Sequence, residues 1–232
     1  MKTINQLFSI CVFALSSTLV LAQVDNVDLK AFDKLDIATN VEVEVLEGAP
    51  RAEINMVRGD REDLLVQVNG DELLIKFKNK KWGLFNGGNP KAKIKVYTNK
   101  PLKYIEASSS SLVYSDLVFK VDKFEADASS SATIEVAVDA DKVTAEASSS
   151  SEIVIDGTTD DLSIAASSSA DIKAKNLKAN YVKAKTSSSA SVTVWANEKL
   201  TARASSSSSI KYKGDPANKD VSSNSSGSVK KM

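Results

Sequence analysis

The chain has 232 residues, enough for one or two domains with a sizeable core. Its 30 Lys and Arg residues balance 30 Asp and Glu residues, so no net charge recruits nucleic acid or an anionic membrane. Histidine is absent, which excludes His-based acid–base catalysis, Ser-His and Cys-His nucleophile pairs, and metal sites that need imidazole.

Residues 1–22 have the pattern of a cleaved export signal. Lys2 supplies the positive start, Leu7–Leu21 is apolar but short and broken by polar residues, and a small residue precedes Gln23. The only cysteine, Cys11, lies inside this segment, so the mature chain has no thiol for a disulfide or a metal. No later segment is long and apolar enough to span a bilayer. We expect an exported protein located in the periplasm, at the cell surface or outside the cell.

Residues 23–105 are predicted to form irregular β-coils that cap one end of the fold. Their β-rich segments are separated by Gly, Asn and Asp residues typical of turns. The segments are Val41–Val45, Ala52–Met56, Leu64–Val68, Leu73–Phe77 and Ala92–Val96. We expect wider coils that start the same solenoid as the repeats below, with a boundary near Ile105 and no linker.

Residues 106–232 contain a serine cluster that returns every 18 to 21 residues. The clusters begin at Ser108, Ser129, Ser148, Ser167, Ser187 and Ser205, with a degenerate copy at Asn224. Apolar residues keep a fixed offset on both sides of each cluster, as Val143 and Ile153 do, which a disordered tract has no reason to maintain. A unit this short cannot bury its own apolar side, so copies must stack. The sequence predicts an all-β parallel solenoid with about 19 residues per coil and about 4.8 Å between coils.

Stacked coils place equivalent residues in columns. One apolar column is predicted to run through Val113, Ile134, Ile153, Ile172, Val192, Ile210 and Val229. Period-two alternation carried through each cluster predicts that its second serine points inward, at Ser109, Ser130, Ser149, Ser168, Ser188 and Ser206. The first and third serines then point outward as a flat, neutral strip, and they are the candidate binding residues: Ser108, Ser110, Ser129, Ser131, Ser148, Ser150, Ser167, Ser169, Ser187, Ser189, Ser205 and Ser207.

The repeated Ala-Ser-Ser-Ser turns and the final Ser-Ser-Gly227-Ser-Val229 resemble the auto-transporter adhesin head GIN domain family, a domain of unknown function. The resemblance covers about Phe32 to Lys230. It implies a right-handed parallel β-helix, and it implies no catalytic residues. Family members typically alternate Gly and Ser at these turns, whereas this chain has almost only Ser.

The remaining chemical motifs have plainer explanations. Two Ser-x-x-Lys matches, at Ser208 and Ser228, would place their members on opposite sides of a strand. Carboxylates that could hold Ca²⁺ or act on a polysaccharide occur at Asp139, Asp141, Asp156, Asp160 and Asp161. Acidic residues are also common in turns because they form local hydrogen bonds there. We therefore predict no catalytic residue, metal or cofactor. Carboxylates gathered in a groove would instead favour an enzyme.

These features predict a non-catalytic, adhesin-like binding protein whose partner is a glycan or a surface protein. The alternatives are a carbohydrate-active enzyme on the same scaffold and a purely structural envelope protein. Ice binding usually uses threonine, which is absent from the serine columns.

The two ends of the solenoid differ in charge. Residues 23–170 carry 26 acidic and 17 basic residues, whereas residues 171–232 carry 4 and 12. The chain also stops just after Val229, leaving little to cover the last coil. Because an open β-edge invites pairing, we expect either a homo-oligomer through this end or a tail that folds back.

Overall fold

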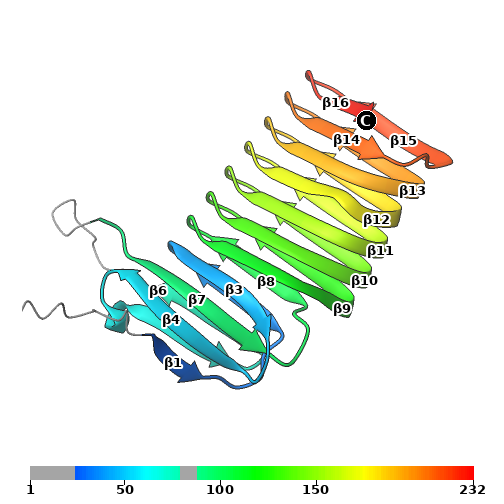
Figure 1. Ribbon diagram of the computed structural model, residues 1–232. Coiled ribbons are helices and arrows are strands. Elements are labelled where there is room, and N and C mark those ends of the chain that lie inside the picture. The colour runs from blue at the N-terminus through cyan, green and yellow to red at the C-terminus, as the bar shows by residue number, and fades with distance from the viewer. Residues whose placement is uncertain (1–23, 79–87) are drawn as a thin grey trace, which may run out of the picture.

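The computed structural model describes residues 24–78 and 88–232, and in it the serine repeats form a stack of parallel coils (Figure 1). The predicted export signal and Cys11 lie outside these residues. Each repeat is one long strand that bends midway: β9 Leu112–Ala128, β10 Thr133–Ala147, β11 Glu152–Ala166, β12 Asp171–Thr186 and β13 Ser191–Ala204. The described residues contain no helix long and apolar enough to cross a membrane.

Each strand contributes to two layers. At one end of the stack, β3 (Val41–Glu47) pairs with the first half of β9, and β8 (Tyr104–Ser108) pairs with its second half. At the other end, β14 (Ser209–Lys213) and β15 (Asn218–Ser223) pair with the two halves of β13. The first halves therefore form sheet A, the second halves form sheet B, and the core lies between them.

The predicted apolar column is confirmed. Val113 pairs with Ile134, and the register continues through Ile153, Ile172, Val192, Ile210 and Val229. From Val113 to Ile210 these side chains are fully buried, and Val229 in the last coil is partly buried. Side-chain period two explains the rest of the pattern, since buried and exposed residues alternate along each half-strand.

The N-terminal strands continue both sheets. Sheet A adds β7 (Lys91–Thr98), β4 (Arg51–Arg58) and β1 (Asp25–Asp28), the last two antiparallel to their neighbours. Sheet B adds β2 (Lys34–Ala38), β6 (Glu72–Phe77) and β5 (Leu64–Asn69), which follows a short 3-10 helix η1 (Arg61–Asp63). The five predicted strands are present. The antiparallel β1 and β5 form the outer edges of this end of the stack.

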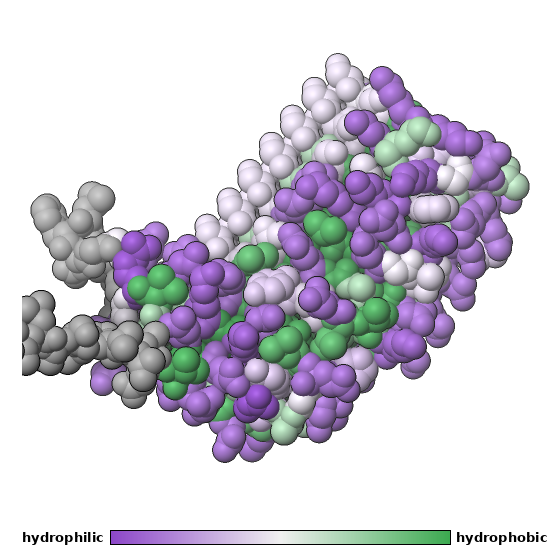
Figure 2. All heavy atoms as spheres, viewed as in Figure 1, coloured by the Kyte–Doolittle hydropathy of each residue, from purple (hydrophilic) through white to green (hydrophobic). Residues whose placement is uncertain are grey.

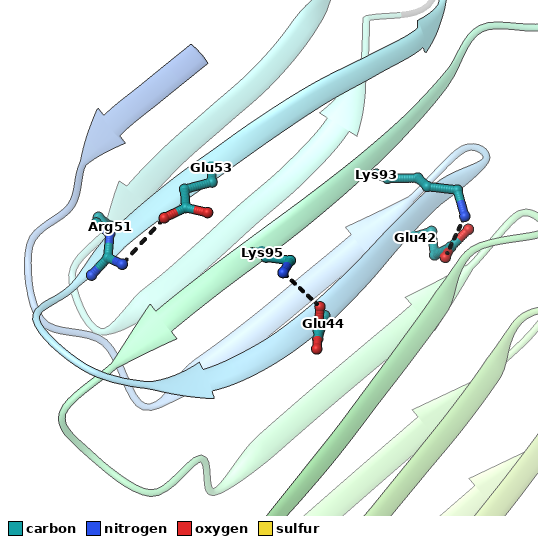
Figure 3. Close-up of polar contacts among 6 residues, drawn as sticks. All are labelled: Glu42, Glu44, Arg51, Glu53, Lys93 and Lys95. Atoms are coloured by element: carbon teal, nitrogen blue, oxygen red, sulfur yellow. Dashed lines mark hydrogen bonds and ion pairs between the residues drawn. The ribbon is translucent and has the colours of Figure 1, made fainter. Parts of the chain in front are cut away.

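Opposite charges occupy facing positions on the outside of sheet A near this end (Figure 3). Lys93 on β7 lies 3.0 Å from Glu42 on β3, and Lys95 lies 3.7 Å from Glu44. Exposed pairs of this kind contribute at most about 1 kcal/mol each. Their effect is to avoid stacked like charges in an in-register sheet.

The last coil consists of β14, β15 and β16 (Ser228–Lys231). In the described chain β15 pairs with β13 alone and β16 with β14 alone, so each has an unpaired edge. No described segment folds back over this end, which contradicts the tail alternative.

Candidate binding surface

The serine clusters form tight turns that join sheet B of one coil to sheet A of the next. In each turn two consecutive serines have positive φ, as Ser130 (51°) and Ser131 (62°) do, and the Ala132 N–H donates to the Ser129 carbonyl at 3.1 Å. Positive φ at both central residues is the signature of a type I′ turn. These fourteen residues are called the serine ridge: Ser109, Ser110, Ser130, Ser131, Ser149, Ser150, Ser168, Ser169, Ser188, Ser189, Ser206, Ser207, Ser225 and Ser226.

The prediction for the second serine of each cluster is wrong. Ser109, Ser130, Ser149, Ser168, Ser188 and Ser206 are exposed, not buried. The buried position is the fourth residue, as at Ala132 and Ser151. Two left-handed residues reverse the chain, so the alternation does not pass through the turn unbroken. Buried Ser151 is satisfied, since its hydroxyl donates to the Ala128 carbonyl at 2.8 Å.

The two candidate binding columns do not lie on one flat strip. The third serines, such as Ser131 and Ser150, sit at the exposed tips of the turns beside the second serines. The first serines, such as Ser129 and Ser148, are half-buried on the sheet B side. Figure 2 shows the tips as a row of evenly spaced, pale knobs along one edge of the stack.

Backbone hydrogen bonds lock successive turns together. The Ser131 N–H donates to the Ser149 carbonyl of the next coil at 3.0 Å, and Ser150 donates to Ser168 at 3.0 Å. The pattern starts at Asn40, which donates to Ser109, and continues to Ser207, which donates to Ser225. The ridge is therefore a regular array with one turn per coil, about 4.8 Å apart.

Serine is a costly residue for these turns. Left-handed φ costs a residue with a Cβ about 1–2 kcal/mol, whereas Gly pays nothing and Asn is tolerated. The chain nevertheless places serine at fourteen such positions. Turn conformation alone would favour Asn-Gly.

This argument predicts a gain in stability from asparagine. Replacing Ser130, Ser149 and Ser168 with Asn should raise the free energy of unfolding by about 0.5 kcal/mol per site, because Asn tolerates left-handed φ. Urea unfolding measures the effect, and Ser→Ala at the same sites is the control, since Ala gains no such relief. If the Asn variant is less stable than the wild type, serine stabilises the turns and the cost argument is wrong.

A shallow groove of about 610 Å³ runs along the outside of sheet B beside the ridge. One wall consists of the half-buried first serines Ser129, Ser148, Ser167, Ser187 and Ser205. The other consists of the residues two positions earlier, where Glu106, Asp127 and Glu146 are followed by Ala165, Lys185 and Arg203. This axial groove is acidic at one end and basic at the other.

A tyrosine holds the acidic end together. The Tyr104 hydroxyl lies 3.0 Å from both Glu106 Oε2 and Asp127 Oδ2. Burial, then the neighbouring carboxylates, raise the pKa of Asp127, although its bond to Tyr104 acts in the opposite direction. Burial also raises the pKa of Tyr104. At the basic end Arg203 pairs with Asp220 at 2.5 Å.

Sequence reasoning missed the charged wall of this groove. The signal was present, because each of these residues stands two positions before the first serine of its cluster. When the coils are aligned, the charge at this position changes from negative to positive at Ala165. The change is not apparent when the sequence is read from end to end.

The acidic residues considered above as ligands or catalytic groups lie at the edge of the coils opposite the serine ridge. Asp139 accepts a hydrogen bond from Thr158 at 2.8 Å, and Asp160 accepts one from Asn180 at 2.8 Å. Asp156 lies 3.4 Å from the Asn176 amide. These contacts link adjacent coils. Among the described residues no group of three acidic, His or Cys side chains is arranged to hold a metal ion.

Comparison with known proteins identifies relatives of this arrangement. The model of a family described as "Putative auto-transporter adhesin, head GIN domain" matches residues 31–216. A crystal structure from Bacteroides fragilis, described as a "putative adhesin", is similar with a TM-score of 0.81 and 20% identity, covering 90% of this chain and 96% of that one. An adhesin so described from Parabacteroides merdae gives a TM-score of 0.72 at 16% identity, covering 90% and 95%.

A further similar structure, from Parabacteroides distasonis, is described as a "putative lipid binding protein". It gives a TM-score of 0.69 at 25% identity, covering 90% of this chain and 96% of that one. No curated protein matches the chain.

Proposed function

Because this chain belongs to the family described as "Putative auto-transporter adhesin, head GIN domain", we propose that it is an exported, non-catalytic binding protein whose serine ridge contacts a repetitive surface ligand. The pattern of an export signal in residues 1–22 supports a location outside the cytoplasm. The ligand class that fits best is a glycan, with a surface protein as the alternative partner.

The observation that carries this proposal is the use of serine where turn conformation favours other residues. Fourteen left-handed serines present hydroxyl groups at the tips of stacked turns. Each hydroxyl both donates and accepts a hydrogen bond, as sugar hydroxyls do. One such contact is weak in water, but repetition at about 4.8 Å lets many act together on a polymer.

Lysine substitution at the ridge should weaken binding. We expect the mature chain to bind glycans on an array and to bind whole cells. Changing Ser131, Ser150 and Ser169 to Lys should reduce binding at least about 10-fold, since bulky charged groups replace neutral hydroxyls at three successive tips. Lipid vesicles belong in the assay because one similar structure is described as a lipid binding protein.

The matched control adds the same charge to another surface. Thr133, Ala137 and Val154 point outward on sheet A, and changing all three to Lys should leave binding intact. If the folded ridge variant binds as well as the wild type does, the serine ridge is not the binding site. Absence of any ligand for the wild type would favour a purely structural envelope protein.

One observation favours the carbohydrate-active enzyme. Glu106 and Asp127 line a groove, and the raised pKa of Asp127 is a property of a general acid. Against it, the Tyr104 hydroxyl bonds to both carboxylates and so occupies the space between them. Release of reducing ends from array glycans, lost on Asp127→Asn, would establish the enzyme instead.

A further inference from the structure

The charged wall of the axial groove changes sign once along the solenoid. Register pairs Glu106 with Asp127, Asp127 with Glu146 and Glu146 with Ala165. It then pairs Ala165 with Lys185 and Lys185 with Arg203. One coil away from Ala165, Glu146 on one side matches Lys185 on the other. Two coils away, Asp127 matches Arg203, so both matched positions carry opposite charges.

We propose that this face binds a second copy of the chain in antiparallel orientation. A two-fold axis at the level of Ala165, parallel to the strands, reverses the order of the coils while each column stays opposite itself. Glu146 then faces Lys185 of the second copy, Asp127 faces Arg203, and Ala165 faces Ala165. The surface is thus complementary to itself, as an isologous contact requires.

The neighbouring columns agree with this arrangement. On the ridge side, Ser148 faces Ser187 and Ser167 faces Ser167, and paired hydroxyls can donate and accept in turn. On the other side, Thr144 faces Lys183, so no like charges meet. One column further out, Lys123 would face Lys199, and this repulsion limits the contact to three columns.

The size of the contact predicts a weak complex. Seven coils extend about 34 Å, and three columns span about 15 Å, so the two copies bury about 1,000 Å² in total. This is at the low end for protein–protein interfaces, where weak and transient complexes are found. Because the charges are exposed, association should weaken as salt increases.

The two-fold rotation has a structural consequence. Each column remains opposite itself, so both serine ridges lie along the same edge of the dimer. Two antiparallel ridges would then face any ligand together. The pairing itself rests on the charge column and does not depend on what the ridge binds.

The inner pair gives the sharpest test. Glu146 and Lys185 are exposed and make no ion pair within the described part of the chain, whereas Arg203 already pairs with Asp220. In sedimentation equilibrium we expect the mature wild-type chain to dimerise. Glu146→Lys or Lys185→Glu alone should weaken dimerisation about 10- to 100-fold, because each places two like-charged pairs across the axis.

Mixing the two variants should restore association as a heterodimer, because both contacts become attractive again. Glu135→Lys, on the outside of sheet A in the same coil as Glu146, should dimerise as the wild type does. A wild type that stays monomeric at about 1 mM, or a mixture of the variants that stays monomeric, overturns the proposal.

A single introduced cysteine tests the position of the axis. The mature chain has no cysteine, so Ala165→Cys adds a unique thiol that should be joined to its copy by a short bis-maleimide. Ala137→Cys, at an outward alanine of sheet A, should react without joining two chains. Equal joining by both variants would contradict contact through sheet B.

Discussion

Replacing Gly157 with alanine is expected to destabilise the protein by at least about 4 kcal/mol, among the largest effects of a single substitution. Gly157 has φ of 121°, and a Cβ there would lie 1.9 Å from the Val138 carbonyl oxygen of the preceding coil. Backbone that is paired on both sides cannot move away cheaply. Chemical denaturation should show the loss, and Gly70→Ala, with φ of 65° and open space around it, should cost only about 1 kcal/mol.

Gly214 provides a matched comparison within the same fold. Its φ is 90°, and an added Cβ would also lie 1.9 Å from a carbonyl oxygen, that of Ala196. Gly214, however, lies between β14 and β15, and within the described chain β15 pairs with β13 alone. In a solenoid each coil interacts with its neighbours alone. Gly214→Ala should therefore expose only residues after 209 to hydrogen exchange, whereas Gly157→Ala should affect β10, β11 and β12. Equal, local effects of both changes would contradict this account.

The apolar columns could be predicted from the sequence because every coil repeats them. Ile134, Ile153 and Ile172 hold the same offset from their serine clusters, and stacking follows from the need to bury them. The five N-terminal strands were also recognisable from local alternation. The antiparallel pairing of β4 with β7 and of β5 with β6 was not, since the sequence of a non-repeating segment does not indicate which strands are neighbours.

The serine turns show where such reasoning fails. Asn or Gly at the two central positions would have predicted a type I′ turn, because both residues adopt left-handed φ readily. Serine does not, so alternation was extended through the turn and Ser130 and its equivalents were placed inside. The same geometry explains why Ala132 and Ser151 are buried instead. The wrong prediction therefore falls at the turn positions, where serine is not the residue that the backbone conformation favours.

The two charged surfaces of the solenoid have different physical roles. On sheet A, Glu42 and Glu44 are neutralised by lysines on the neighbouring strand (Figure 3). On sheet B, three acids stack in consecutive coils, and burial raises the pKa of Asp127 among them. Stacked like charges cost free energy in an isolated coil stack. A second copy that brings Lys185 and Arg203 over them would remove that cost.

At the open end of the solenoid, two lysines stand at positions that apolar core residues hold in the preceding coils. The column of Phe124, Val143, Leu162, Val182 and Leu200 ends at Lys219, and the column that passes through Val194 and Tyr212 ends at Lys231. Both ammonium groups approach Asp215 Oδ1, at 3.8 Å and 3.0 Å. Lysines on an edge strand are a known defence against edge-to-edge pairing.

Removing these two charges should turn the end of the solenoid into an association site. Lys219→Leu combined with Lys231→Val continues the apolar columns to the free edges of β15 and β16, where unpaired backbone groups can accept another strand. We expect large oligomers or fibres in place of a soluble chain, seen by size-exclusion chromatography and electron microscopy. Adding Lys185→Glu to both test and control separates this contact from pairing through sheet B.

The control changes two outward lysines of the same coil region by the same chemistry. Lys211 and Lys230 pair with each other on the outside of sheet A, so Lys211→Leu with Lys230→Val alters charge and hydropathy equally without extending the core. This variant should remain soluble. If both double variants associate alike, general surface hydropathy drives the effect. If neither associates, the lysines do not guard the end, and another feature of β15 and β16 must keep it from pairing.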